Sequence, residues 1–348
     1  MSDGRRFRGE PGAGPPQVGR DPLEGSGAAH RNRGAVRAVR RAVHGVLLLD
    51  KPVGLSSNDA LQKVKRLYRA AKAGHTGTLD PLATGLLPLC FGAATKFSQV
   101  SLDADKRYLA TLRLGVTTTT GDAEGTVTRE LPAAVTEARA RLACASCIGE
   151  IEQLPPMYSA LKREGRPLYD YARAGIEIER VPRRVTIHRI DIVECKTSTL
   201  VIDVVCSKGT YIRTLAEAIG EALGCGGHLA ALRRTASGPL TIASAHTLEH
   251  LQQLGEAERD ALLLPTDALL TEWPEIRLSN DDAGRFLSGL RRRLDAADAP
   301  RVRVYGPQPR AFLGSGHVKA GELISSRLLS PLEVQGLLDA PDPCPATT

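Results

Sequence analysis

Apolar runs separated by short polar turns mark the first elements of the chain. Residues 45–50 (GVLLLD) predict a buried strand, which the following Lys-Pro pair ends. Ser56 and Asp59 have the spacing of a helix-capping pair, so a helix is expected next. The apolar positions of this helix repeat at helical spacing and are Ala60, Val64, Leu67 and Ala71.

Two further segments carry strand patterns. Residues 107–114 alternate between apolar and polar side chains, which predicts a strand with Tyr108 on its inward face. Residues 200–206 are apolar and rich in Val and Ile, and the turn at 207–210 leads into a helix. The apolar positions of that helix are Ile212, Leu215, Ile219 and Leu223. Strands and helices alternate without the regular period of a doubly wound sheet, so the predicted fold class is α+β.

The chain divides into four segments by composition. Residues 1–43 are rich in Arg, Gly and Pro without apolar periodicity, which predicts a disordered tail. Residues 44–272 carry most strand and helix patterns and predict the main domain. Residues 273–331 predict a small β-rich domain of roughly 60 residues, near the lower limit for an independent core. Residues 332–348, rich in Pro and Ala, predict a flexible tail.

Positive charge is concentrated in the N-terminal segment. The 348-residue chain has a formal net charge of +7, and residues 1–43 hold nine Arg and four acids, so they supply five of these charges. The remainder is nearly neutral, so any binding of nucleic acid must depend on local basic patches. The seven cysteines are scattered and odd in number, which favours reduced thiols over a disulfide framework.

Several functional classes lack their sequence signals. No apolar run approaches the roughly 20 residues of a membrane helix, and the Arg-rich N-terminus has no secretory core, so a cytoplasmic protein is expected. Phosphate-loop, dinucleotide-binding and nucleophile-elbow motifs are absent, so neither a cofactor nor a metal is expected. The stretch HTLEH at 246–250 matches an inverted zinc-protease motif, but Thr247 favours the alternative, the N-cap of a surface helix.

Asp80 is the one acid in the stretch AGHTGTLDPLATGLLP (73–88). It precedes Pro81 and is surrounded by glycines that allow another molecule's backbone to approach. Either it accepts backbone amides in a turn, or it is catalytic and needs a cation to keep it ionised. Arg213 is a candidate for that cation. It lies in the first turn of its predicted helix, where the positive end of the helix dipole disfavours a cation, so a carboxylate partner is needed to stabilise it. The alternative is that Arg213 is exposed and reaches into solvent. Tyr211, two residues before Arg213, could lie near the same site.

The residues around these candidates resemble a known family. Asp80 lies within GHTGTLDP, Tyr108 within DKRY and Arg213 within CSKGTYIRT. With the stretches GVLLLDKPVGLSSNDALQKVKR, FGAATKFSQ, QLPPMYSALKREGRPLYDYARAGIE and GCGGHLAALRR, these motifs resemble the bacterial tRNA pseudouridine-55 synthases of the TruB family. The resemblance covers residues 45–251 densely.

The resemblance implies a fold and an activity. It implies a pseudouridine-synthase domain with a mixed or antiparallel sheet at 44–272, an RNA-gripping loop at about 153–182, and a PUA-like domain at 273–331. The implied activity is isomerisation of uridine 55 in the tRNA T-loop by base flipping and Asp-dependent cleavage and reattachment of uracil. The implied partner is the T-arm of tRNA, with no obligatory protein partner; a monomer is expected. The alternatives are a tRNA-folding chaperone acting without chemistry and a guide-RNA-dependent synthase.

The resemblance also implies roles for single residues. Asp80 matches the catalytic nucleophile and Arg213 its partner. Tyr108 matches the aromatic residue that stacks on the target base, and His75 the residue that enters the T-loop. Tyr211 and Leu232 match two further side chains, which line the uracil pocket in the family. The basic residues expected to contact RNA are Lys51, Lys63, Arg66, Lys106, Lys162 and Lys208.

Overall fold

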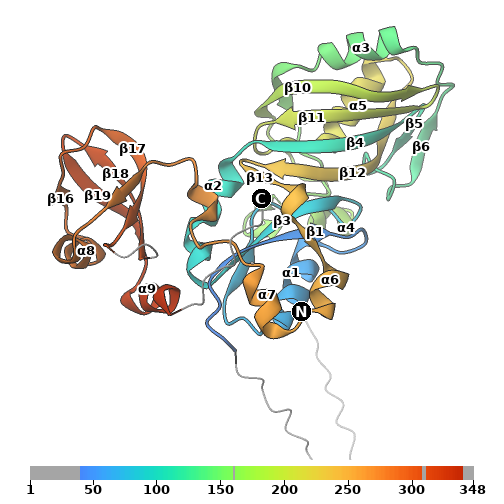
Figure 1. The fold of residues 1–348 in the computed structure, drawn as a ribbon. Coiled ribbons are helices and arrows are strands. Elements are labelled where there is room, and N and C mark those ends of the chain that lie inside the picture. Colours follow the sequence, from blue (N-terminus) through green and yellow to red (C-terminus); the bar gives the residue numbers. More distant parts are fainter. Residues whose placement is uncertain (1–39, 160, 308–310, 340–348) are drawn as a thin grey trace, which may run out of the picture. The chain divides into compact units, whose positions relative to one another are not determined.

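A ten-stranded sheet forms the centre of the main domain in the computed structural model, which describes residues 40–159, 161–307 and 311–339 (Figure 1). The strands follow the order β14 (His246–Thr247), β1 (Gly45–Lys51), β3 (Thr84–Phe91), β12 (Gly227–Ser237), β4 (Lys106–Leu114), β11 (Thr199–Cys206), β10 (Arg183–Lys196) and β7 (Gly149–Gln153). Two short strands pair at its side, β2 (Ala73–His75) with β3 and β13 (Leu240–Thr241) with β12. The pairs β1–β14 and β3–β12 are parallel and the others antiparallel, so the predicted α+β class with a mixed sheet is confirmed.

The first strand and helix form as their sequence predicts. Strand β1 is buried along its apolar run and pairs with β3, with Leu47 opposite Leu89. Helix α1 (Ser57–Leu67) begins where the Ser56 hydroxyl accepts a hydrogen bond from the Asp59 amide, so the predicted cap is confirmed. The helix ends before Ala71, because Arg69 adopts a positive φ of 48°. Its buried side is part of one hydrophobic core with β1 and β3.

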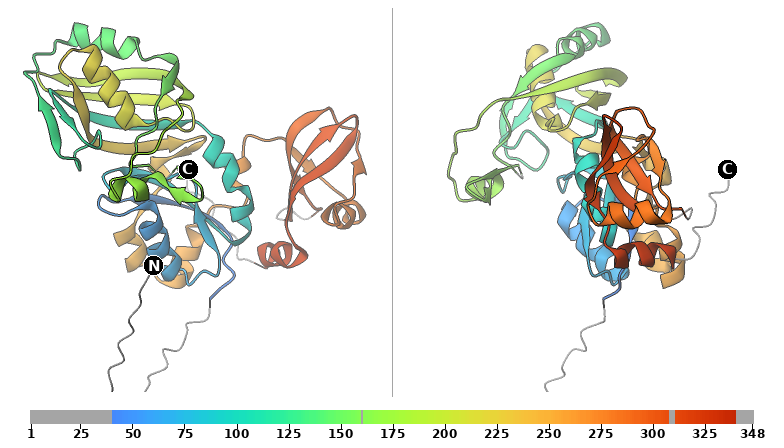
Figure 2. Two further views of the ribbon diagram at one scale, coloured as in Figure 1. Left: turned by 180° about the vertical axis from the view of Figure 1, so that it is seen from behind. Right: turned by 90° about the vertical axis from the view of Figure 1, so that its left-hand side faces the viewer.

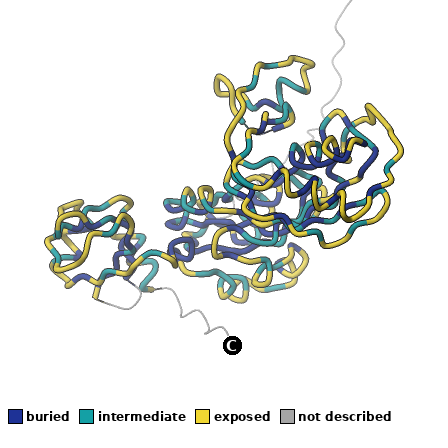
Figure 3. Tube along the Cα trace, turned by 90° about the horizontal axis from the view of Figure 1, so that it is seen from above, coloured by how far each residue is buried: buried dark blue, intermediate teal, exposed yellow. Residues whose placement is uncertain are grey.

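A second core lies between the other half of the sheet and two helices. Helices α3 (Glu137–Ala145) and α5 (Ile212–Ala222) pack on the same face of the sheet, and Figure 2 shows α5 lying across it. The predicted apolar positions Ile212, Leu215, Ile219 and Leu223 are all buried there. Most strands of the main sheet carry buried positions, and Figure 3 shows buried stretches of the trace in the interior with exposed residues toward the outside.

A five-stranded sheet occupies the region predicted to be a small β-rich domain. Its order is β15 (Glu275–Arg277), β17 (Ala299–Tyr305), β18 (Phe312–Lys319), β19 (Glu322–Leu328) and β16 (Arg292–Arg293), with helix α8 (Asn280–Leu287) beside it. Its apolar side chains share a core with residues of β1, β3 and the segment after β3. The rings of Phe97 and Phe312 lie 5.3 Å apart, for example. The exact domain boundaries stay a prediction.

Both terminal segments predicted to be disordered or flexible include residues that are folded. Arg41 forms a backbone bridge with Ala70, and Val43 is buried, so disorder up to residue 43 is wrong for the described residues 40–43. At the other end, helix α9 (Pro331–Leu338) replaces the start of the predicted flexible tail. Ser330 and Glu333 form a capping box that satisfies its first amides. The remaining tail predictions, 1–39 and 340–348, lie outside the described residues.

Two further predictions concern thiols and membranes. The described cysteines are free thiols, as predicted: Cys90, Cys144, Cys147, Cys195, Cys206 and Cys225. Cys344 lies outside the described residues. No helix within the described ranges is both long enough and apolar enough to cross a bilayer.

Candidate active site

An ion pair joins the two residues singled out in the sequence. Asp80 lies in the loop between β2 and β3, and Arg213 in the first turn of α5. Nη2 of Arg213 lies 3.0 Å from Oδ2 of Asp80. The Arg213 side chain is only 7% exposed, whereas that of Asp80 is 43% exposed. The pair therefore presents its carboxylate to solvent while the cation is held inside the protein.

Asp122 is a second acid at this site, which the sequence did not reveal. Its Oδ2 lies 3.2 Å from Nη1 of Arg213, and its side chain is 4% exposed. Its other oxygen accepts hydrogen bonds from the Thr120 hydroxyl at 2.5 Å and the Glu124 amide at 3.1 Å. Asp80 is therefore solitary in sequence but not in space. The only signal for Asp122 was its Gly-flanked setting, GDAEG, which is similar to that of Asp80.

The guanidinium of Arg213 also joins three loops. It donates hydrogen bonds to the carbonyl of Thr120 at 3.3 Å and to the carbonyl of Tyr158 at 2.6 Å. Tyr158 belongs to the segment predicted to grip RNA. A single buried side chain therefore contacts the Asp80 loop, the Asp122 loop and the 153–182 segment.

The surroundings of Asp80 act on its pKa in both directions. The net result is a pKa of Asp80 above its ordinary value: burial raises it most, the charge of Arg213 lowers it, and the nearby carboxylate of Asp122 raises it. Lys51 lowers this pKa as well. Arg213 is thus the main group that favours the ionised carboxylate.

The backbone of the Asp80 loop is fixed by hydrogen bonds from α1 and the turn before it. The Ser57 hydroxyl accepts from the Leu79 amide at 2.7 Å and donates to the Leu79 carbonyl at 3.1 Å. The Gly54 amide donates to the Pro81 carbonyl at 2.8 Å. These bonds hold the residues on both sides of Asp80, so its position is set by the fold.

Tyr108 and Leu232 lie at the centre of the sheet, where both are partly buried and contact both cores of the main domain. They stand on the paired strands β4 and β12. His75 lies on β2 opposite Leu89, and burial lowers its pKa. Tyr211 is the N-cap residue of α5, and its amide donates to the side chain of Gln153 at 2.9 Å.

Two of the predicted RNA contacts are contradicted by burial. Lys51 is 0% exposed, and its ammonium donates to the carbonyls of Pro52 at 2.9 Å and Leu55 at 2.6 Å. Lys106 is 7% exposed, and its ammonium donates to three carbonyls at the end of helix α2 (Ser98–Asp103), those of Ser101, Leu102 and Ala104. Since these ammonium groups are occupied by backbone acceptors, neither is available to a phosphate.

The other four basic candidates are exposed: Lys63, Arg66, Lys162 and Lys208. Within the 153–182 segment, helix α4 (Leu168–Arg173) brings arginines over tyrosine rings. Arg166 lies 4.7 Å from the centroid of Tyr171, and Arg173 lies 5.4 Å from that of Tyr169. Aromatic and cationic groups are therefore interleaved there, and RNA contact by these residues stays a prediction.

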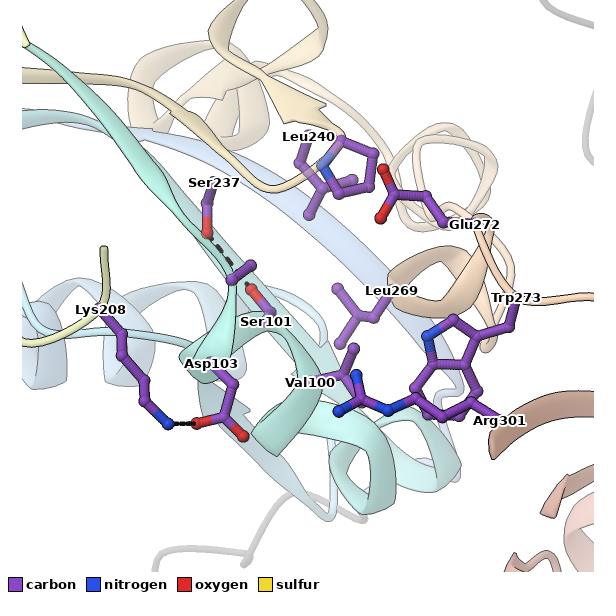
Figure 4. A pocket seen from close by; sticks show the side chains of 12 residues that line it. Val100, Ser101, Asp103, Lys208, Ser237, Leu240, Leu269, Glu272, Trp273 and Arg301 are labelled. Atoms are coloured by element: carbon purple, nitrogen blue, oxygen red, sulfur yellow. Dashed lines mark hydrogen bonds and ion pairs between the residues drawn. The ribbon is translucent and has the colours of Figure 1, made fainter. Parts of the chain in front are cut away.

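A cavity of about 360 Å³ lies elsewhere in the molecule, between α2 and the start of the C-terminal sheet. Figure 4 shows the ion pair of Lys208 with Asp103, at 2.8 Å, and the guanidinium of Arg301 beside the ring of Trp273. Its lining does not include Asp80 or Arg213. It is therefore separate from the catalytic candidates.

The stretch resembling a zinc-protease motif does not have the geometry of one. Thr247 is the N-cap of helix α6 (Leu248–Gln253), as predicted, and its side chain accepts from the His250 amide. His246 therefore lies before the helix, in β14, so the two histidines do not occupy successive turns. Among the residues that the structure describes, no group of three or more His, Cys, Asp or Glu side chains could hold a metal ion.

Comparisons with known proteins match this chain to one family along most of its length. Three family models match: TruB family pseudouridylate synthase, N-terminal domain, at residues 65–212; tRNA pseudouridylate synthase B C-terminal domain at 213–271; and pseudouridine synthase II TruB, C-terminal, at 274–329. The tRNA pseudouridine synthase B of Burkholderia mallei is 58% identical over 300 residues, which are 84% of this chain and 96% of the relative. The tRNA pseudouridine synthase B of Cupriavidus pinatubonensis is 57% identical over 303 residues, with the same two shares.

The fold is also similar to solved structures. A crystal structure of a Cbf5-Nop10-Gar1 complex contains a chain that superposes with a TM-score of 0.63 at 24% identity. The alignment covers 83% of this chain and 86% of that one. At this identity the likeness concerns the fold alone.

Proposed function

This chain belongs to the TruB family of pseudouridylate synthases, and we propose that it isomerises uridine 55 in the T-loop of tRNA to pseudouridine. The observation that carries the proposal is the ion pair between the half-exposed Asp80 and the buried Arg213. It places a carboxylate at the protein surface in one orientation, beside a cation that favours its ionised form.

The reaction needs one such carboxylate. The N1–C1′ glycosidic bond breaks, the uracil rotates, and a C5–C1′ bond forms; C5 loses a proton and N1 gains one, so the product is an isomer. Asp80 acts as the nucleophile or as the stabiliser of the positive charge that develops on the sugar. No electrons and no external group are transferred, so this reaction by itself requires no cofactor.

Arg213 and Asp122 prepare the carboxylate. Arg213 opposes the effect of burial on the pKa of Asp80 and so favours the ionised form. Asp122 occupies the other side of the guanidinium and directs it, because the two carboxylates bind different nitrogens. We propose Asp80 as the catalytic residue, with Arg213 and Asp122 as the residues that position it.

The target uridine must leave its stack to reach Asp80. Flipping a base costs a few kcal/mol, which stacking on an aromatic ring can offset. We propose that Tyr108 supplies this ring, that Leu232 and Tyr211 complete the pocket, and that His75 fills the space left in the T-loop. The exposed basic residues and the 153–182 segment then hold the T-arm through its phosphates.

The test measures tritium released from tRNA that carries [5-³H]uridine. Wild type should release tritium, and Asp80→Asn, which keeps the size of the side chain but removes its charge, should release essentially none while binding tRNA. Asp191→Asn is the matched control, because Asp191 is exposed and pairs with Arg189 on β10. Replacing uridine 55 by cytidine should abolish release by wild type.

Two results would count against the proposal. Tritium release by Asp80→Asn at the wild-type rate would exclude Asp80 as the catalytic group. Tight tRNA binding by wild type without any release would instead favour the chaperone that acts without chemistry.

A further inference from the structure

Arg234 is a buried cation that the reaction described above does not use, and it is the last residue of the stretch GCGGHLAALRR. It lies on β12 and is 1% exposed. In the described part of the chain no carboxylate lies within 4.0 Å of its guanidinium. Its hydrogen bonds go to backbone carbonyls: Nε donates to Leu86 at 2.7 Å, and Nη2 donates to Gly77 at 3.2 Å. Burying a charge without a counter-ion is unfavourable, so the surrounding dipoles must be arranged to accommodate it.

One of these carbonyls belongs to the loop that carries Asp80. Gly77 has a φ of +85°, and a Cβ at this position would lie 3.2 Å from Nη1 of Arg234. The sequence had suggested that the glycines of this stretch admit another molecule's backbone. At Gly77 the close neighbour is the guanidinium of Arg234, which lies against the loop three residues before the nucleophile candidate.

The second neighbour of Arg234 is Tyr108. The antiparallel register of β12 and β4 places these two residues directly opposite each other, so their side chains lie on the same face of the sheet. Burial raises the pKa of the Tyr108 hydroxyl, and the charge of Arg234 lowers it. The guanidinium therefore lies close to the polar end of the proposed stacking residue.

The backbone of Arg234 is fixed as well. On its other side β12 pairs with β3, where Arg234 lies beside Gly85. A Cβ at Gly85, whose φ is +99°, would lie 2.3 Å from the Arg234 carbonyl oxygen. The strands can approach this closely only because position 85 has no side chain. Arg234 is thus anchored to β3 and β4 while its guanidinium reaches the Asp80 loop.

We propose that Arg234 is a positioning residue that holds the Asp80 loop and Tyr108 in one fixed arrangement. This inference rests on the proposed pseudouridine synthase activity. Arg234 itself is too deeply buried to contact RNA. Its loss should therefore slow the reaction without weakening the binding of tRNA.

The test compares Arg234→Met and Arg234→Lys with Arg233→Met. Arg233 is the adjacent residue, but its side chain is 40% exposed and forms an ion pair with Asp50 at 2.7 Å. Single-turnover tritium release gives the rate, filter binding gives the Kd for tRNA, and circular dichroism establishes folding. We expect Arg234→Met to be at least 10-fold slower, equivalent to about 1.4 kcal/mol, with a Kd within about twofold of wild type. Arg233→Met should react at about the wild-type rate.

Arg234→Lys decides the outcome if Arg234→Met does not fold. Lysine keeps the buried charge but cannot reproduce the planar fork that donates to both carbonyls. We expect it to fold and to react at least about fivefold more slowly than wild type. A folded Arg234 variant that reacts within twofold of wild type would overturn the proposal, and so would a loss that appears entirely in the Kd. If wild type releases no tritium, the proposed function has failed instead, so the two failures are distinguishable.

Discussion

Replacing Asp122 by Asn tests whether a second carboxylate orients Arg213. The Asn oxygen can still accept from the Thr120 hydroxyl and the Glu124 amide, as Oδ1 of Asp122 does. In that orientation its amide group points a donor at Nη1 of Arg213, where Asp122 places an acceptor at 3.2 Å. If the amide flips, Arg213 regains an acceptor but the other two bonds are lost. Either way the guanidinium loses the fixed arrangement in which it contacts Asp80.

The size of the effect follows from the interaction removed. A hydrogen bond to a charged group contributes about 1.5–3 kcal/mol, which corresponds to roughly a 10- to 150-fold change in rate. We expect the single-turnover rate of Asp122→Asn to fall by a factor in that range. The variant retains the carboxylate of Asp80 itself, so it should remain more active than Asp80→Asn.

The pH dependence of the rate gives a second readout with a definite sign. The charge of Asp122 raises the pKa of Asp80. Its removal lowers that pKa, so the ionised carboxylate persists to lower pH. The rate, measured by tritium release from about pH 4 to pH 8, falls at low pH as Asp80 is protonated. In Asp122→Asn this acid side of the rate profile should therefore move to lower pH. The reasoning is refuted if Asp122→Asn is as fast as Asp191→Asn, or if its acid side moves to higher pH.

Two further variants test the buried residues that support the loops around the site. Ser57→Ala leaves the Leu79 amide and carbonyl without their partner, so the free energy of unfolding in urea should fall by about 1–3 kcal/mol; an unchanged unfolding midpoint would contradict this. Burial lowers the pKa of Lys51 from 10.5 to about 8, so between these values the unfolded chain binds more protons than the folded one. The free energy of unfolding of wild type should therefore rise relative to that of Lys51→Met as the pH rises from 8 to 10.5. If the difference between the two free energies does not change with pH, the pKa of Lys51 is not lowered in the folded protein.

The sequence indicated the central pair because each partner has a local signature. Asp80 precedes a proline among glycines, and Arg213 occupies a helix start where a cation needs a carboxylate. Asp122 has only its Gly-flanked setting and Arg234 only its place at the end of GCGGHLAALRR, and neither signal indicates a partner. Their contacts join segments far apart in the chain, and register between distant strands cannot be read from local periodicity. Only the folded sheet shows that Arg234 stands opposite Tyr108.

The errors in the sequence prediction have a common physical origin. Lysines are usually solvated, but the ammonium group of Lys51 donates to carbonyls of the turn that follows it, and that of Lys106 donates to carbonyls at the end of helix α2. Residues 331–338 have little polar-apolar alternation, yet the capping box at Ser330 starts a helix there. In these cases the structure is determined by backbone groups that require hydrogen-bond partners, and not by the amino-acid composition of the segment.

The contacts of Arg213 determine when the site can exist during folding. Its carbonyl partners, Thr120 and Tyr158, lie 93 and 55 residues away along the chain. Contacts of such separation form late, because the entropy of closing the intervening loops must first be overcome by the packing of the sheet. A chain that has formed its cores but not yet ordered all three loops would be compact and inactive. Recovery of activity on refolding should therefore lag behind recovery of secondary structure.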